Sequence, residues 1–165
     1  MAGVARPRLL VGCLVLFTIG ACAANVHAVS IDDAAYKRVW AADWSAAQRD
    51  SVPYRATATS PGVCNVGGSQ RACVLTDKRV AGDLDRLIQD LQTTRVPSEY
   101  AKASSAVLDA CKTEMQGLQL RDRGIGQQDS QSFAQSDALL RAASHSMTIA
   151  YALFPPYDRP IPAPL

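Results

Sequence analysis

The stretch TDKRVAGDLDRLIQDLQTT, residues 76–94, decides the fold class of this chain. Apolar residues return along it every three or four positions, which is the period of one face of an α-helix; they are Val80, Leu84, Leu87, Ile88 and Leu91. Most positions between them are charged or polar, so one face suits a core and the other suits water. The stretch predicts an amphipathic helix that begins at Thr76 or Asp77 and packs against other elements.

Three further segments show the same period and predict helices over 30–49, 98–123 and 129–153. Gly124 and Gly126 are expected to end the third helix. Residues of the third helix expected to face inward are Val107, Leu108, Cys111, Met115 and Leu118. Those of the fourth helix are Phe133, Leu140, Ala143, Met147, Ala150, Tyr151 and Phe154.

Short connections join the second helix to the third and the third to the fourth, which favours antiparallel neighbours. The sequence therefore predicts an all-α fold, an up-down-up-down four-helix bundle over residues 31–154. The first two helices are joined by one long connection, residues 50–75, which is rich in Pro, Gly, Ser and Thr. Residues 155–165 hold five of the nine prolines and predict an extended tail.

The N-terminal segment has the layout of a secretory signal peptide. Arg6 and Arg8 form a basic head, and an uncharged, mostly apolar run follows from Leu9 to Ile19. That run is too short to span a bilayer as a helix, which takes about 20 residues. We therefore expect residues 1–21 to be removed during export.

The residues after the apolar run, Ile19-Gly20-Ala21-Cys22, resemble a bacterial lipobox. The resemblance to bacterial lipoproteins covers residues 1–22 and implies a mature chain that begins at Cys22, acylated with palmitate or a similar chain. Residues 22–30 would then form a tether. Val26-His27-Ala28 offers an alternative site for ordinary signal peptidase, and cleavage there would release a soluble chain beginning at Val29.

Charge excludes one class of function. Removal of residues 1–21 takes away two of the 17 Lys and Arg residues, which leaves 15 basic against 15 acidic residues. Neither a basic run nor a basic stripe with interleaved aromatic residues is present, so we expect no nucleic-acid partner.

The cysteines of an exported chain meet an oxidising environment and can pair. Antiparallel helices joined near residues 95–97 place Cys73 level with about residue 119, so Cys111 lies roughly 12 Å away along its helix. A disulfide needs Cα atoms within about 7 Å of each other. Cys64–Cys73 is therefore the favoured pair, with Cys111 as a buried free thiol. Cys64–Cys111 stays open, because the loop that holds Cys64 is long.

No catalytic motif, zinc-ligand spacing or phosphate loop is found in the sequence, so we expect no metal, no cofactor and no enzymatic activity. Tyr36, Trp40 and Trp44 recur every four residues. Such a row usually faces a core, and it could instead line a pocket for an apolar ligand.

These features predict a binding protein that is anchored by lipid to the outer face of a cell membrane. We expect it to contact an envelope protein through the loop that the disulfide closes. The contact residues would be Asn65, Val66, Gly67, Gly68, Ser69 and Gln70. The first alternative is a carrier of an apolar ligand in a cavity between the helices, and an enzyme of unknown class is the second.

Overall fold

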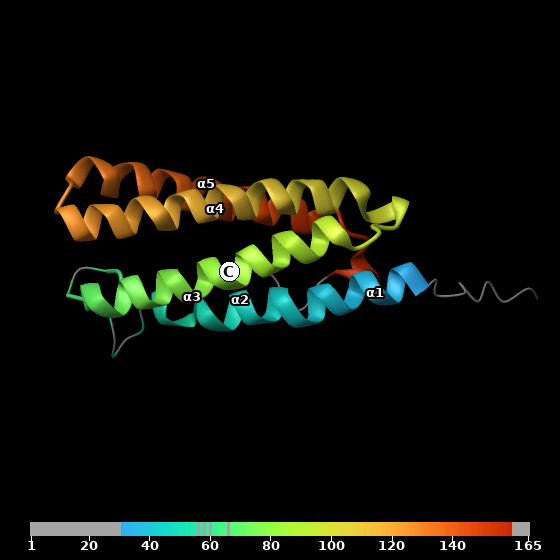
Figure 1. Ribbon diagram of the computed structural model, residues 1–165, viewed down its shortest axis with the longest axis horizontal. Helices are drawn as coiled ribbons and strands as arrows, with labels where there is room; N and C mark the ends of the chain where they lie inside the picture. Colours follow the sequence, from blue (N-terminus) through green and yellow to red (C-terminus); the bar gives the residue numbers. More distant parts are fainter. Residues whose placement is uncertain (1–30, 56, 58, 60, 66, 160–165) are drawn as a thin grey trace, which may run out of the picture.

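The computed structural model describes residues 31–55, 57, 59, 61–65 and 67–159, and within these it is all-helical (Figure 1). The expected all-α class is confirmed, whereas the up-down-up-down topology stays a prediction. The long helices are α1 (Ile31–Val39), α2 (Ser45–Asp50), α3 (Gln70–Thr93), α4 (Ala101–Gln127) and α5 (Ser130–Ala152). The signal peptide, Cys22, the tether, Val66 and most of the tail lie outside the described residues.

A π-helical segment, η1 (Trp40–Trp44), joins α1 to α2, so that the three form one nearly continuous first helix. The described residues also form three short 3₁₀ segments: η2 (Val52–Tyr54), η3 (Ser98–Tyr100) and η4 (Pro156–Asp158). The first helix lies along α3, and α4 lies along α5 (Figure 1). Contacts between α3 and α4 join these two helix pairs.

The core between the pairs has an aliphatic and an aromatic part. The predicted stripe of α3 from Val80 to Leu91 is buried in full. Tyr36, Trp40 and Trp44 are also buried, as their spacing indicates. Tyr36 stacks on Tyr100 at 5.2 Å between ring centres, and Trp40 meets Phe154 edge-on at 5.2 Å. The aromatic part thereby ties the first helix to one end of the α4–α5 pair, where α4 begins and α5 ends.

The predicted start of α3 was wrong by more than one turn. The helix begins at Gln70 rather than Thr76, and Ser69 caps it by accepting a hydrogen bond from the Ala72 backbone N–H at 3.3 Å. A serine cap satisfies a backbone donor that would otherwise lack a partner, and it therefore starts a helix ahead of the apolar stripe. Gln70 belongs to the helix and not to the loop.

The predicted end of the third helix was wrong as well. α4 continues through Gly124 and Gly126 to Gln127, and Gln128 takes the left-handed backbone conformation with φ of 53°. A Cβ at Gly124 would lie 3.0 Å from the Phe133 ring, so this glycine permits close packing of α5. Phe133 itself is 37% exposed, contrary to its predicted inward position.

Candidate functional site

A cleft lies between the α4–α5 pair and the segment that follows α2. It consists of two adjoining cavities of about 650 and 310 Å³, which share Tyr54, Arg121 and Leu140 in their walls. The disulfide loop and the start of α3 close one end, and Trp44 of the first helix lies at the other.

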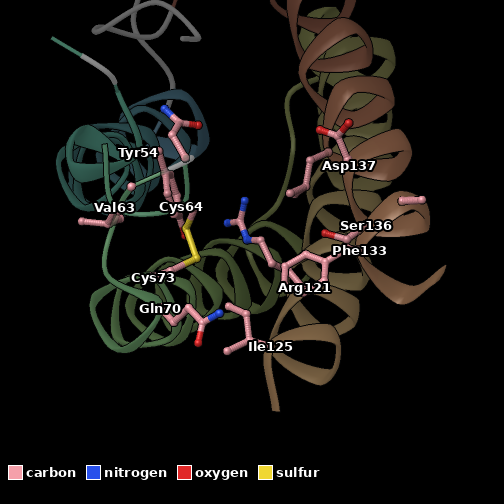
Figure 2. A pocket seen from close by; sticks show the side chains of 15 residues that line it. Tyr54, Val63, Cys64, Gln70, Cys73, Arg121, Ile125, Phe133, Ser136 and Asp137 are labelled. Atoms are coloured by element: carbon pink, nitrogen blue, oxygen red, sulfur yellow. A yellow bond between two sulfur atoms is a disulfide. The ribbon is translucent and has the colours of Figure 1, made fainter. Parts of the chain in front are cut away.

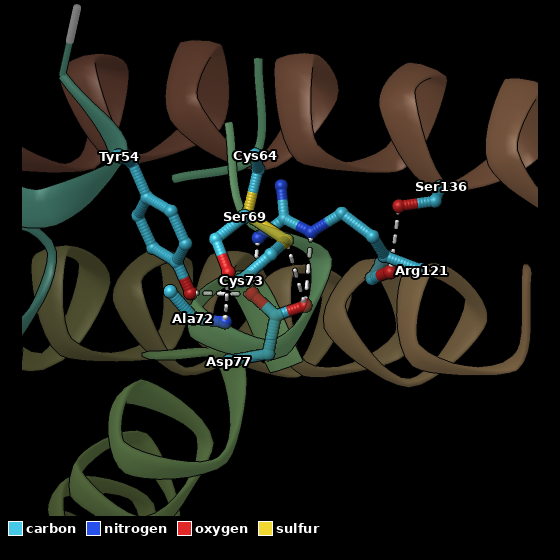
Figure 3. Close-up of a disulfide and its surroundings, with 9 residues drawn as sticks. Tyr54, Cys64, Ser69, Ala72, Cys73, Asp77, Arg121 and Ser136 are labelled. Atoms are coloured by element: carbon cyan, nitrogen blue, oxygen red, sulfur yellow. Dashed lines mark hydrogen bonds and ion pairs between the residues drawn. A yellow bond between two sulfur atoms is a disulfide. The ribbon is translucent and has the colours of Figure 1, made fainter. Parts of the chain in front are cut away.

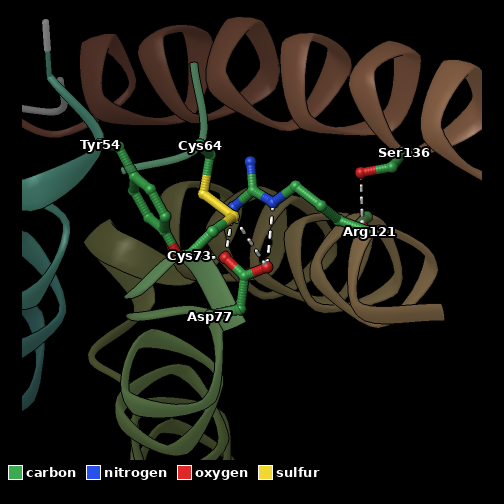
Figure 4. A network of polar contacts seen from close by, with 7 residues as sticks. Tyr54, Cys64, Cys73, Asp77, Arg121 and Ser136 are labelled. Carbon is green, nitrogen blue, oxygen red and sulfur yellow. Dashed lines mark hydrogen bonds and ion pairs between the residues drawn. A yellow bond between two sulfur atoms is a disulfide. The ribbon is translucent and has the colours of Figure 1, made fainter. Parts of the chain in front are cut away.

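A polar network marks the junction of the two cavities (Figure 4). Arg121 of α4 donates to both carboxylate oxygens of Asp77 on α3, from Nε at 2.9 Å and from Nη2 at 2.5 Å. The Tyr54 hydroxyl donates to the same carboxylate at 2.6 Å, and the Arg121 guanidinium lies over the Tyr54 ring at 4.8 Å. Burial and the Asp77 charge raise the pKa of Tyr54 well above its ordinary value. The network therefore gives the buried Asp77 side chain two hydrogen-bond donors, Arg121 and Tyr54.

The disulfide lies directly beside this network (Figure 3). Cys64 and Cys73 are bonded, with Cα atoms 4.9 Å apart, and the Cys73 sulfur lies 3.9 Å from an Asp77 oxygen. The favoured pairing is thus confirmed, and Cys64–Cys111 is excluded. Cys111 is a buried free thiol, as predicted, and burial raises its pKa well above the ordinary value. A thiol kept protonated in the core has no nucleophilic character.

Cys64, Cys73 and Asp77 are close enough in space to suggest a metal site, with possible ligand atoms within 4.8 Å of one another. Their bonding argues against one. Both sulfurs are consumed by the disulfide, and the Asp77 carboxylate already accepts hydrogen bonds from Arg121 and Tyr54. The group is a structural junction.

The larger cavity brings the predicted contact loop to face α4 and α5 (Figure 2). Asn65, Gly67, Gly68 and Gln70 lie on one wall, and Ile125 and Phe133 lie on the other. Figure 2 shows Arg121 reaching between these walls beside the disulfide. Four of the six predicted contact residues therefore line a cavity and do not form a separate surface.

The smaller cavity has a mixed lining of apolar side chains and of polar or charged groups. Trp44, Leu118 and Met147 supply apolar walls, whereas Gln48 of α2 and Glu114 of α4 supply oxygen atoms. Burial raises the pKa of Glu114 to about 7, although the positive charge of Arg121 opposes the shift. Glu114 can consequently exchange its proton near neutral pH.

Only one of the three predicted pocket aromatics reaches this cleft. Trp44 lines the smaller cavity, whereas Tyr36 and Trp40 line a separate depression that includes Tyr157 and Asp158. The sequence reasoning missed Gln48, Asp77, Glu114 and Arg121. A signal for Glu114 was available, since it lies three residues after Cys111 and four before Leu118, on the inward stripe of α4.

None of the described helices combines the length and the apolar character that crossing a membrane requires. Comparisons of the chain with protein-family models, with curated proteins and with solved structures found no match.

Proposed function

We propose that this chain is an exported, lipid-anchored protein of the cell envelope that binds a small ligand with an apolar body in the cleft. The observation that carries this proposal is the smaller cavity, where apolar side chains and convergent polar groups share one lining. Cavities of about 300–1,000 Å³ are typical of small-molecule sites. Trp44, Leu118 and Met147 supply the walls, and the volume of about 310 Å³ lies at the lower end of that range.

The helix topology is part of this proposal. In an up-down-up-down bundle, short connections hold α3 to α4 and α4 to α5, whereas the connection between α2 and α3 is long. A cleft beside the long connection can then open without any change in the packing of the other helices.

The ligand-binding part is tested with the neutral fluorescent probe N-phenyl-1-naphthylamine on the purified protein. We expect saturable binding at one site. Ser144 lines the smaller cavity, so Ser144→Trp should fill it and weaken binding at least tenfold. Ser146→Trp is the matched control, because Ser146 is exposed on the same helix and does not line the cavity. Equal binding by both variants would contradict the proposal.

The anchor is tested separately. Cys22→Ala should abolish membrane association of the full-length precursor expressed in a bacterium, and intact-mass analysis of the unaltered protein should show an acylated chain that begins at Cys22. An unmodified chain that begins at Val29 would refute the anchor and leave the ligand site untouched.

A second candidate is contact with an envelope protein through the disulfide loop. The larger cavity favours it, because its loop wall is polar and lies at the surface. Replacement of Asn65 by a bulky residue should then weaken capture of the partner and leave binding of the naphthylamine probe unchanged.

A further inference from the structure

The smaller cavity contains two oxygen acceptors that lack a donor. Glu114 makes no hydrogen bond or ion pair within the described part of the chain. Gln48, on the opposite wall, has a side-chain oxygen that is buried from water and has no hydrogen-bond partner among the described residues. Buried acceptors normally have a partner, so the Gln48 oxygen indicates that a donor comes from outside the chain, and the Glu114 carboxyl, which lines the same cavity, can accept from that donor as well.

Arg121, one of the two arginines in the cavity wall, already has an acidic partner. Arg121 binds both oxygens of Asp77 and lies over the Tyr54 ring, and its side chain is only 15% exposed. Its charge is thereby matched by Asp77. The other arginine of the wall, Arg55, is exposed, and Glu114 is the carboxyl that lines the cavity. A cation that enters the cavity meets a free acceptor there.

From this geometry we infer that the ligand is an amphiphile with a primary ammonium group, which Glu114 and Gln48 bind together while the hydrocarbon part packs on Trp44, Leu118 and Met147. An ammonium carries three donors, so it can serve both oxygens at once. A hydroxyl group carries only one donor, and a carboxylate carries none and would repel Glu114. Hydrogen bonds between ionised partners are also about twice as strong as neutral ones.

This inference rests on the proposed function. It also predicts that binding of the ammonium ligand depends on pH. Between pH 8 and 5.5 the alkyl ammonium keeps its charge, because amines of the lysine type titrate near 10.4. Glu114 takes up a proton over that interval, since its pKa is about 7. The ionisable groups that face or influence Glu114 are Arg121 and Cys111 of α4, Tyr54 and Arg55 of the segment after α2, and Asp77 of α3. Asp122 of α4, which interacts with Asp77 and does not line the cavity, has a pKa that burial raises to about 6. Because Glu114 loses its charge as the pH falls through about 7, binding should weaken on acidification.

The test is displacement of N-phenyl-1-naphthylamine by decylamine, 1-decanol and decanoate at pH 8, below the concentrations at which they form micelles. We expect decylamine to displace the probe at a concentration at least tenfold lower than 1-decanol, with decanoate the weakest. At pH 5.5 the advantage of decylamine over 1-decanol should fall at least threefold.

Glu114→Gln keeps the shape of the side chain and removes its charge, so it should erase both the advantage and its pH dependence. Glu99→Gln is the matched control, because Glu99 is exposed and is the other glutamate of the chain. Gln48→Leu provides a second variant with Glu114 intact, and it should reduce the preference for decylamine at least threefold.

The outcomes separate the two proposals. If 1-decanol or decanoate displaces the probe as well as decylamine does, the ammonium assignment is wrong and the cleft remains a ligand site. If the probe does not bind at all, the proposed function fails. If Glu114→Gln folds as judged by circular dichroism and still prefers decylamine, the anchoring role of Glu114 is refuted.

Discussion

Arg121 and Asp77 join α4 to α3 through two parallel hydrogen bonds at a point where Asp77 is 1% exposed. Such a pair fixes the relative position of two helices, because a planar guanidinium accepts only a narrow range of carboxylate orientations. It also adjoins the disulfide and both cavities. This contact therefore helps to set the shape of the cleft.

Removal of the arginine should leave a buried, unmatched carboxylate. We expect Arg121→Met to lower the free energy of unfolding by about 3–5 kcal/mol. The double variant Asp77→Asn with Arg121→Met should recover more than half of that loss, because no charge then remains buried. Urea unfolding of the single and double variants measures the difference. Losses that simply add would show that the two side chains act independently.

Reduction of the disulfide should destabilise the protein without unfolding the core. A cross-link that closes a loop of about ten residues contributes roughly 2.5–3 kcal/mol if it acts through the entropy of the unfolded chain. Cys64→Ser with Cys73→Ser should show a loss of this size in urea. Peptide mapping without reductant should recover Cys64 bound to Cys73, with Cys111 alkylated only after unfolding. Alkylation of Cys111 in the folded protein would contradict its buried position.

The centre of α3 should respond strongly to truncation. Leu87 is 0% exposed, so Leu87→Ala should cost about 2–5 kcal/mol through lost burial and a cavity. Leu75 of the same helix is 52% exposed, and Leu75→Ala should change stability by no more than about 0.5 kcal/mol. Thermal unfolding of the two variants gives the comparison. A similar loss in both would mean that Leu75 is covered in solution.

Substitutions in the loop between Cys64 and Cys73 should differ in their effect on the melting temperature. A Cβ at Gly68 would lie 2.4 Å from the Gly62 carbonyl oxygen, so Gly68→Ala must displace backbone and should lower the melting temperature by several degrees. Asn65 is exposed, and Asn65→Ala should leave the melting temperature within about two degrees of the unaltered protein. The reverse order would mean that the loop has another conformation in solution.

The carboxyl of Glu114 should make stability depend on pH. Its pKa is about 7 in the folded protein against 4.5 as the ordinary value, so the folded chain holds a proton that the unfolded chain releases. The free energy of unfolding should therefore fall as pH rises from about 4.5 to 7. Glu114→Gln should flatten this slope and raise stability at pH 8, whereas Glu99→Gln should change neither. A residual slope is expected in Glu114→Gln, because Asp43 and Asp122 also have raised pKa values.

The helices could be predicted from the sequence where burial repeats with a regular period. The stripe of α3 and the aromatic row of the first helix both follow this rule, and both are buried. The ends of helices follow different physics. Ser69 starts α3 through one side-chain hydrogen bond, and Gln128 ends α4 in a conformation that is more common for glycine. Neither feature changes the spacing of the apolar residues. The start of α3 and the end of α4 were therefore predicted wrongly from that spacing.

The disulfide could be predicted because the positions of the cysteines along the helices limit which pairs lie close enough to bond. The cleft could not, since its polar members come from separate elements, among them Gln48 from α2, Tyr54 from η2, Glu114 and Arg121 from α4, and Ser144 from α5, with Asp77 of α3 bound to Tyr54 and Arg121. Arg121 lies near the predicted end of its helix, where positive charge is favourable without any partner. Its bond to Asp77 spans 44 residues, and no local pattern records such a contact.

Because of the π-helical segment Trp40–Trp44, the directions in which side chains leave the first helix depend strongly on the number of residues in that helix. A π turn is equivalent to one residue inserted into an α-helix, and it shifts the angular register of everything before it relative to everything after. Tyr36 stacks on Tyr100 upstream of the shift, whereas Trp44 and Gln48 face the cleft at its downstream end and beyond. Deletion of Ala41 or Ala42 would restore regular winding, and Tyr36 and the cleft residues could then no longer both occupy their present positions. The extra residue is the element that allows one helix to serve two differently oriented contacts.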